Sequence, residues 1–221
     1  IINQTGLVYL ILAPLAAALP FSDGADENSR SLRCVVLTRC PRKRYIRARA
    51  TSSFFVGFMI VAIPAALNLL WCQVAFPAFA PRNAINAISS MPAYDHFFRN
   101  IYLKGLYTSH PYLYAWMNAL GVGFYGGICA LMAYSLSLYV RKYPMFTVAA
   151  PFLVVNFASI AQQTTEVLVS GQINMAAFYA YFQMAEDSQK LPLWAHAGIW
   201  LSLAGLSLWG IRCHANRRDD L

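Results

Sequence analysis

Charge is the property that this sequence most lacks. Charged residues make up only 12% of the 221 residues, about half the share in an ordinary soluble domain. Acidic side chains are the scarcer kind, with nine Asp and Glu against 17 Lys and Arg. So few charges leave too little polar surface for a soluble enzyme, and the 58% apolar content excludes a disordered or fibrous chain. The composition therefore predicts an integral membrane protein.

Several catalytic motifs are missing as well. The chain has no G-x-x-x-x-G-K-[ST] phosphate loop, no H-E-x-x-H zinc motif and no G-x-S-x-G nucleophile turn. We therefore expect this chain to have no enzymatic activity and to bind no metal or cofactor. Cys34, Cys40 and Cys213 have spacings unlike those of zinc sites, so we interpret them as free thiols.

Five windows without Asp, Glu, Lys or Arg interrupt the chain, and each is long enough to cross a bilayer as a helix. None alternates apolar with polar residues as a barrel strand does. The sequence thus predicts an all-α, polytopic membrane protein that forms a single transmembrane domain over 1–221. The five expected spans are residues 5–21, 51–76, 111–140, 144–165 and 192–212. Between them we expect a cytoplasmic loop at 22–50 and outer segments at 77–110 and 166–191, the latter two with short helices in the headgroup region.

The basic residues predict an orientation. Thirteen of the 17 Lys and Arg lie in the 22–50 loop, after the third span or in the C-terminal tail. Because basic residues stay on the cytoplasmic side, five spans place the N-terminus outside and the C-terminus in the cytoplasm of a cell membrane. The chain begins at Ile1 with apolar residues, which favours a further helix before it and six spans in the full chain. Basic residues beside spans indicate lipid contact and no nucleic acid.

Few polar groups fall inside the expected spans. Asn68, Asn118 and Asn156 either hydrogen-bond between helices or line a substrate path. The string Gly121-Val-Gly123-Phe-Tyr-Gly126 matches a dinucleotide fingerprint but lies in an apolar helix. We interpret these glycines, Gly123 among them, as a close helix contact, either within this chain or with a second subunit.

The 22–50 loop has an ordered pattern. Asp26 and Glu27 precede a possible helix cap at Asn28 or Ser29, a short amphipathic run follows, and Pro41 ends it. A basic stretch and Tyr45 come next, before an apolar run with an internal proline. The motifs are Leu19-Pro20-Phe21-Ser22-Asp23, Asp26-Glu27, Thr38-Arg39, Arg42-Lys43-Arg44-Tyr45, Phe54-Phe55-Val56-Gly57-Phe58, Pro64-Ala65-Ala66-Leu67-Asn68-Leu69-Leu70 and the stretch from Tyr143 to Leu153.

Together these motifs resemble the permease subunits of bacterial ATP-binding-cassette (ABC) exporters of the type-2 membrane class, over about residues 6–160. The resemblance implies a six-helix permease paired with a second permease half, identical or not. It also implies two separate ABC ATPase subunits, which alone would bind ATP and Mg²⁺. The ATPase-coupling element would comprise Glu27, Arg39, Arg42 and Tyr45. The alternative is a structural or regulatory membrane subunit that transports nothing. The substrate cannot be read from the sequence, and the direction of transport rests on the resemblance alone.

Overall fold

The computed structural model describes residues 12–21, 41–75, 106, 109–140, 145–157 and 193–216. This part of the chain is helical and contains no strand, which confirms the all-α prediction. Residues 12–18 form a short α-helix that continues into the 3₁₀ turn η1 (Leu19–Phe21). The long helices are α3 (Arg42–Ala75), α7 (Pro111–Tyr139) and α10 (Leu193–Asn216), and a shorter helix covers Met145–Phe157.

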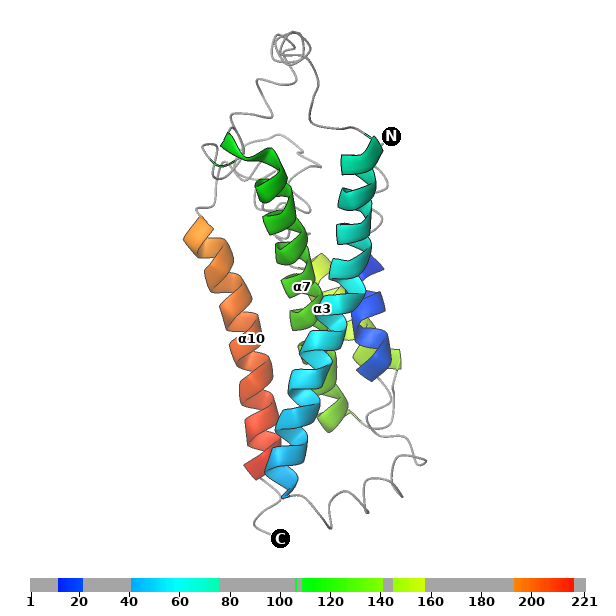
Figure 1. The fold of residues 1–221 in the computed structure, drawn as a ribbon. Coiled ribbons are helices and arrows are strands. Elements are labelled where there is room, and N and C mark those ends of the chain that lie inside the picture. The colour runs from blue at the N-terminus through cyan, green and yellow to red at the C-terminus, as the bar shows by residue number, and fades with distance from the viewer. Residues whose placement is uncertain are drawn as a thin grey trace, which may run out of the picture.

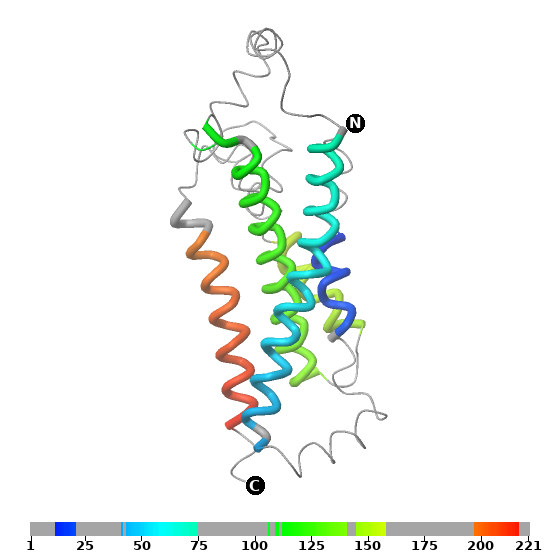
Figure 2. The backbone as a smooth tube through the Cα atoms, in the orientation of Figure 1, coloured from blue at the N-terminus to red at the C-terminus, as the bar shows by residue number. Residues whose placement is uncertain are grey.

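The two longest helices form the centre of the bundle. α3 and α7 run antiparallel and cross near their middles, and they make the most extensive contact between any two described elements. α10 lies beside α7 and runs in the same direction as it does (Figures 1 and 2). The helix at residues 12–18 lies on the other side of the α3–α7 pair (Figure 1). The first turns of α3 therefore lie at the same end of the bundle as the last turns of α7 and α10.

Prolines mark the starts of both central helices. The carbonyl of Pro41 accepts the backbone N–H groups of Arg44 at 2.9 Å and Tyr45 at 3.2 Å, which closes the first turn of α3. Pro111 occupies the first turn of α7. The backbone N–H groups of a first turn have no acceptor within the helix, so the missing N–H of proline costs no hydrogen bond there. Pro64 lies inside α3, which continues through it as the sequence predicts.

The helix bounds agree closely with expectation only for α7, which was expected over 111–140. α3 begins nine residues before the expected start at residue 51, so residues 42–50 are helical and do not belong to a loop. The expected start was taken from where the apolar residues begin, which indicates a membrane crossing and not the end of a helix. The helix itself begins earlier, because Arg and Lys are good helix formers. α10 likewise continues to Asn216, past the expected end at residue 212.

The expectation of five membrane spans is not supported. Within the described residues, two helices are long and apolar enough to cross a membrane, Lys43–Val74 and Tyr112–Tyr139. α10 has the length, but glycines, serines and histidines dilute its apolar content. The Met145–Phe157 helix is shorter than a bilayer crossing requires. The rest of the expected spans and loops lies outside the described residues, at 5–11, 22–40, 76–105, 107–108, 141–144 and 158–192.

Two clusters of buried side chains hold the bundle together. The first joins four helices around Tyr125 and Cys129 of α7, with Ala13 and Ala17 from the N-terminal helix, Val61 of α3 and Val155 of the Met145–Phe157 helix. The second lies at the end where α3 begins, and its members come from α3, α7 and α10: Ile46, Ala50, Leu131, Tyr134, Leu138, Ile211 and Ala215.

Candidate functional site

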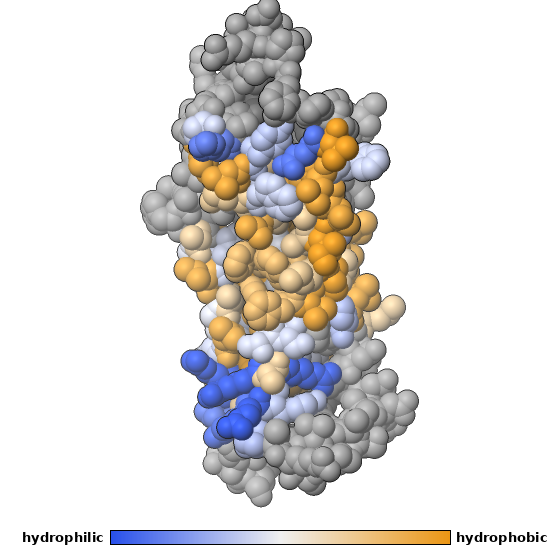
Figure 3. Space-filling view, viewed as in Figure 1, coloured by the Kyte–Doolittle hydropathy of each residue, from blue (hydrophilic) through white to orange (hydrophobic). Residues whose placement is uncertain are grey.

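Positive charge collects at one end of the bundle. Among the described residues, every Lys and Arg lies either in the first eight residues of α3 or near the end of α10. Figure 3 shows hydrophilic residues gathered there, next to a broad apolar zone over the middle of the helices. The described ranges contain no Asp or Glu at all. We call this set the basic end: Arg42, Lys43, Arg44, Arg47, Arg49 and Arg212.

Arg49 is the basic residue most tightly placed by its neighbours. Its Nη1 donates a hydrogen bond to the hydroxyl of Tyr45 at 3.3 Å, one helical turn earlier. Its Cζ lies 6.0 Å from the ring centroid of Tyr134 on α7, at the outer limit of a cation–π contact. Arg49 is thus held between two tyrosines of different helices, and it ties the start of α3 to α7.

Two of the four residues expected in the coupling element lie in this region. Arg42 and Tyr45 belong to the first turn of α3, and not to a loop as the sequence suggested. Tyr45 is half-buried and packs against the Ile46 cluster. Glu27 and Arg39 lie outside the described residues.

The glycines of α7 contact α3 within this chain. A Cβ placed on Gly126 would lie 2.7 Å from the backbone oxygen of Gly57 and 2.5 Å from Cγ2 of Val61. A Cβ on Gly57 would in turn lie 2.8 Å from the oxygen of Gly126 and would collide with Cβ of Ala130. Gly57 and Gly126 therefore mark the point where the two backbones touch.

Two further glycines of α7 accommodate aromatic rings. A Cβ on Gly123 would meet Phe58 at 2.8 Å, and one on Gly127 would meet Phe54 at 2.7 Å. Of the two alternatives left by the sequence, Gly123 thus has its contact inside this chain. We call the surfaces around Gly57 on α3 and Gly126 on α7 the glycine crossing.

A buried hydrogen bond lies beside the glycine crossing. The hydroxyl of Ser53 donates to the backbone oxygen of Ala130 at 3.1 Å, and Ser53 is fully buried. Reasoning from the sequence overlooked both Ser53 and Gly57. The signal was present, because Ser53 and Gly57 are four residues apart, the small-xxx-small spacing of close helix pairs.

The three span asparagines do not form one group. Asn68 is exposed on α3 and lies 4.0 Å from the sulfur of Cys72, a contact within the same helix. Nδ2 of Asn156 donates to the oxygen of Phe152 at 2.7 Å, again within one helix. Asn118 differs, because its Oδ1 is buried in α7 and has no hydrogen-bond partner. Of the three asparagines, Asn118 alone has a buried polar atom available to another group.

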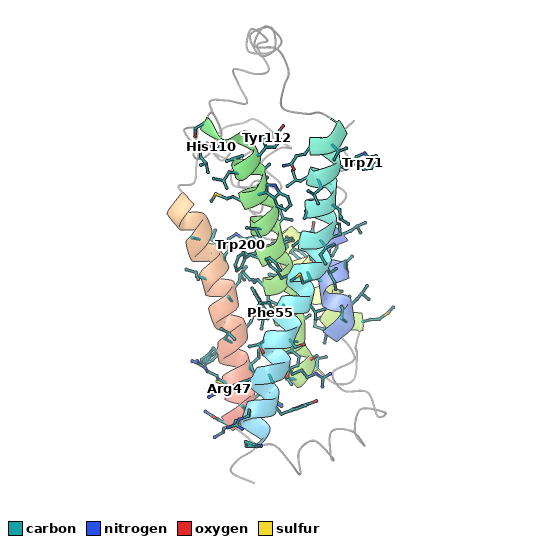
Figure 4. All side chains as sticks on the ribbon, in the orientation of Figure 1. Arg47, Phe55, Trp71, His110, Tyr112 and Trp200 are labelled. Atoms are coloured by element: carbon teal, nitrogen blue, oxygen red, sulfur yellow. The ribbon has the colours of Figure 1, made fainter. Side chains whose placement is uncertain are left out.

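α10 is joined to α7 by aromatic contacts. The hydroxyl of Tyr139 donates to the backbone oxygen of Gly210 at 2.7 Å, and its ring packs edge-on against His214 with centroids 5.4 Å apart. Near the middle of the bundle, Trp200 packs edge-on against Tyr125 at 5.0 Å (Figure 4). These contacts position α10 without any ion pair among the residues described.

The cysteines and histidines give no metal centre in the described part of the chain, where no three metal-ligating side chains cluster. Cys72 is exposed, Cys129 is buried and Cys213 is half-buried, and all three are free thiols. Cys34 and Cys40 fall outside the described ranges. Comparison with protein families, with curated proteins and with solved structures finds no match to this chain.

Proposed function

We propose that this chain is the membrane-embedded permease subunit of an ABC exporter, driven by ATPase subunits that are separate chains. The membrane part of the proposal is carried by one observation, an apolar stripe along the outer side of α3. Between Arg47 and Trp71 the exposed side chains are predominantly apolar (Figure 4). These two residues are 24 positions apart, which corresponds to about 36 Å of helix. That length covers a hydrocarbon core of about 30 Å and reaches the headgroups at both ends.

The exposure of α3 argues against a soluble core helix. Only 22% of its most apolar 18-residue window is buried inside the protein. A core helix of a soluble protein buries its apolar face, because exposing it to water costs about 25 cal/mol per Å². An apolar face that contacts lipid tails is not exposed to water, so this cost is absent in a bilayer. The exposed apolar side chains of α3 are therefore compatible with a bilayer and unfavourable in water.

The basic end supports an orientation. The starts of α3 and the ends of α7 and α10 lie at one end of the bundle, and the positive-inside rule assigns such an end to the cytoplasm. In the proposed orientation the N-terminus of the chain is outside and its C-terminus inside, and the other apolar segments form the remaining spans. Single cysteines at Arg42 and Asp95, in an otherwise cysteine-free chain, test it in intact cells. We expect an impermeant maleimide to label Asp95→Cys only, and labelling of Arg42→Cys would reverse the orientation.

The coupling role is supported by how α3 begins. The sequence lacks a phosphate loop, so energy from ATP has to enter through a contact with another subunit. The proposed coupling residue Arg42 lies in the first turn of α3, and the first turns of α3 pack through Ile46 against α7 and α10. A displacement of Arg42 is therefore transmitted to the three long helices together. Arg39 lies three residues before Arg42 in the sequence. ATP and Mg²⁺ bind only the partner ATPase, and a second permease half completes the pathway.

The experiment that tests coupling is charge reversal. Arg39→Glu with Arg42→Glu should preserve insertion and pairing with the second permease, but abolish the stimulation of ATP hydrolysis by the permease. Arg212→Glu is the matched control, because it also reverses a charge at the basic end but lies on α10. Retention of stimulated hydrolysis in the double variant would contradict the coupling role. Failure of the wild type to copurify with any ATPase would favour a structural subunit that transports nothing.

A further inference from the structure

Exposed side chains along the outer side of α3 form one continuous stripe, which is basic at one end and apolar at the other. It starts with two exposed cations, Arg44 and Arg47, which are three residues apart and are therefore neighbours on the helix surface. Steps of four residues lead from Arg47 to exposed Thr51, and then to Phe55 and Met59, which are 60% and 48% exposed. We call these five residues the head-and-tail stripe. Figure 4 shows Arg47 and Phe55 in succession along the helix.

The charge at the head of the stripe has no carboxylate near it in the described part of the chain, which contains no Asp or Glu. Arg49, by contrast, lies against Tyr45 and Tyr134 and is partly buried. Arg44 and Arg47 are exposed and attract an anion from outside the bundle. Because exposed apolar side chains begin at Phe55, two turns further along the same side, the anion that fits best carries an apolar tail.

We propose that the head-and-tail stripe binds an anionic phospholipid. The headgroup phosphate lies against Arg44 and Arg47, where a guanidinium offers paired N–H donors to phosphate oxygens. One acyl chain follows Thr51, Phe55 and Met59 toward the middle of α3. This inference rests on the proposed membrane embedding, and it goes further by naming a lipid class and its site.

A second copy of the chain is a poorer occupant of the same surface. Two copies in one membrane pair about an axis along the bilayer normal, so the same ends of both α3 helices meet. Arg44 and Arg47 of each copy would then face the same cations of the other, which is unfavourable in the absence of counter-charges. An anionic lipid neutralises these cations, and a zwitterionic lipid does so only in part, because it carries its own positive group.

The test measures lipid affinity directly. The purified full chain is inserted into phosphatidylcholine nanodiscs and titrated with dioctanoyl phosphatidylglycerol, with the bound lipid counted by native mass spectrometry. We expect Arg44→Gln and Arg47→Gln each to weaken binding about five-fold, the change expected for one basic residue near a membrane surface. Arg47→Lys should retain part of the affinity. Arg49→Gln is the matched control, because it removes the same charge two residues away on a different side of α3, and it should change the affinity less than two-fold.

The possible outcomes separate this inference from the proposed function. Failure of the wild type to insert into phosphatidylcholine nanodiscs would contradict the membrane proposal and the lipid site with it. Insertion without preference for phosphatidylglycerol would overturn the lipid site alone. Equal losses in Arg47→Gln and Arg49→Gln would show a general charge effect and no site. Glycerophosphate, which has the headgroup anion and no acyl chains, should compete at least ten-fold more weakly than the lipid. Equal competition would assign the stripe to free phosphate.

Discussion

The two halves of the bundle differ in how many side chains of α3 and α10 they bury. In the half that contains the basic end, α3 buries one residue in each turn: Ile46, Ala50, Ser53, Gly57 and Val61. In the half beyond Val61, no side chain of α3 that the structure describes is buried. α10 repeats the contrast over residues 197–216, whose side chains the structure describes, since the buried positions Ser207, Ile211 and Ala215 lie in its last ten residues. We call the two regions the packed half and the open half.

Small residues explain the packed half. Glycines and a serine allow the backbones of α3 and α7 to touch, which increases the dispersion contacts between the two helices. Past Val61 the pattern changes, because Pro64 interrupts the helical hydrogen bonds and larger side chains such as Leu67 and Trp71 follow. Transmembrane helices associate through close packing and not through a hydrophobic drive. The comparison teaches that the close packing of α3 is concentrated at one end of the bundle, although Tyr114 and Ala119 of α7 are buried in the other half.

The largest expected effect is a leucine at the glycine crossing. Gly126→Leu places a side chain where the backbone oxygen of Gly57 lies 2.7 Å from the new Cβ. Backbone cannot rotate away, so the helices separate, and we expect a loss of about 3 kcal/mol in the free energy of unfolding, the upper end for overpacking. Denaturation with SDS in mixed micelles measures it. Gly205→Leu is the matched control, because nothing lies within 4 Å of a Cβ on Gly205, and the comparison would break if both changes cost the same.

A smaller loss follows where a ring can move. Gly127→Leu meets the ring of Phe54 at 2.7 Å, and a ring is the movable end of a side chain. We expect a loss of about 1–2 kcal/mol, within the ordinary range for overpacking. Phe54→Ala should restore much of the stability of Gly127→Leu, since it removes the ring that the leucine meets. An absence of coupling between the two changes would show that Gly127 does not contact α3.

The buried hydrogen bond comes next in size. Ser53→Ala removes the donor to the oxygen of Ala130 and should cost about 1 kcal/mol, since interhelical hydrogen bonds in membranes contribute about 0.6–2 kcal/mol. Ser202→Ala is its control, because the hydroxyl of Ser202 is exposed and bonds only to the oxygen of Ile199 within α10. Unfolding in the same micelles should leave the Ser202 variant unchanged. A Ser53 variant as stable as the wild type would mean that packing alone holds the crossing.

For the packed half, the sequence predicted helices and a close helix contact, but not which residues make that contact. The apolar windows indicated helices, and the span expected at 111–140 agrees closely with α7. Gly123, Gly126 and Gly127 of α7 lie at a helix contact as interpreted, and the structure identifies the partner as α3. Which helices meet, and at which residues, depends on three-dimensional packing that a linear pattern does not contain. The orphaned Oδ1 of Asn118 is of the same kind, because burial of one atom cannot be read from spacing.

The start of α3 was missed for a different reason. Residues 42–50 are rich in Arg and Lys, and a search for membrane crossings treats charge as the end of a span. A helix, however, can continue out of the hydrocarbon region, and its charged turns are then stabilised by contacts such as that of Arg49 with Tyr45. Where a helix extends beyond the bilayer, the apolar segment that crosses the membrane is shorter than the helix, and the two begin at different residues.

The smallest effect is expected in the open half, on the same helix as the largest. Leu67 is 60% exposed and lies six residues past Val61, which is 1% exposed. In a bilayer, Leu67→Ala exchanges one contact with lipid for another, because lipid tails are as apolar as leucine, and we expect a change below about 0.5 kcal/mol. Val61→Ala removes methyl groups that pack against Gly126 and should cost about 1 kcal/mol, as small core truncations do. Equal losses in the two variants, measured by SDS unfolding, would show that the open half is closed by packing in the membrane, and the contrast between the two halves would then disappear.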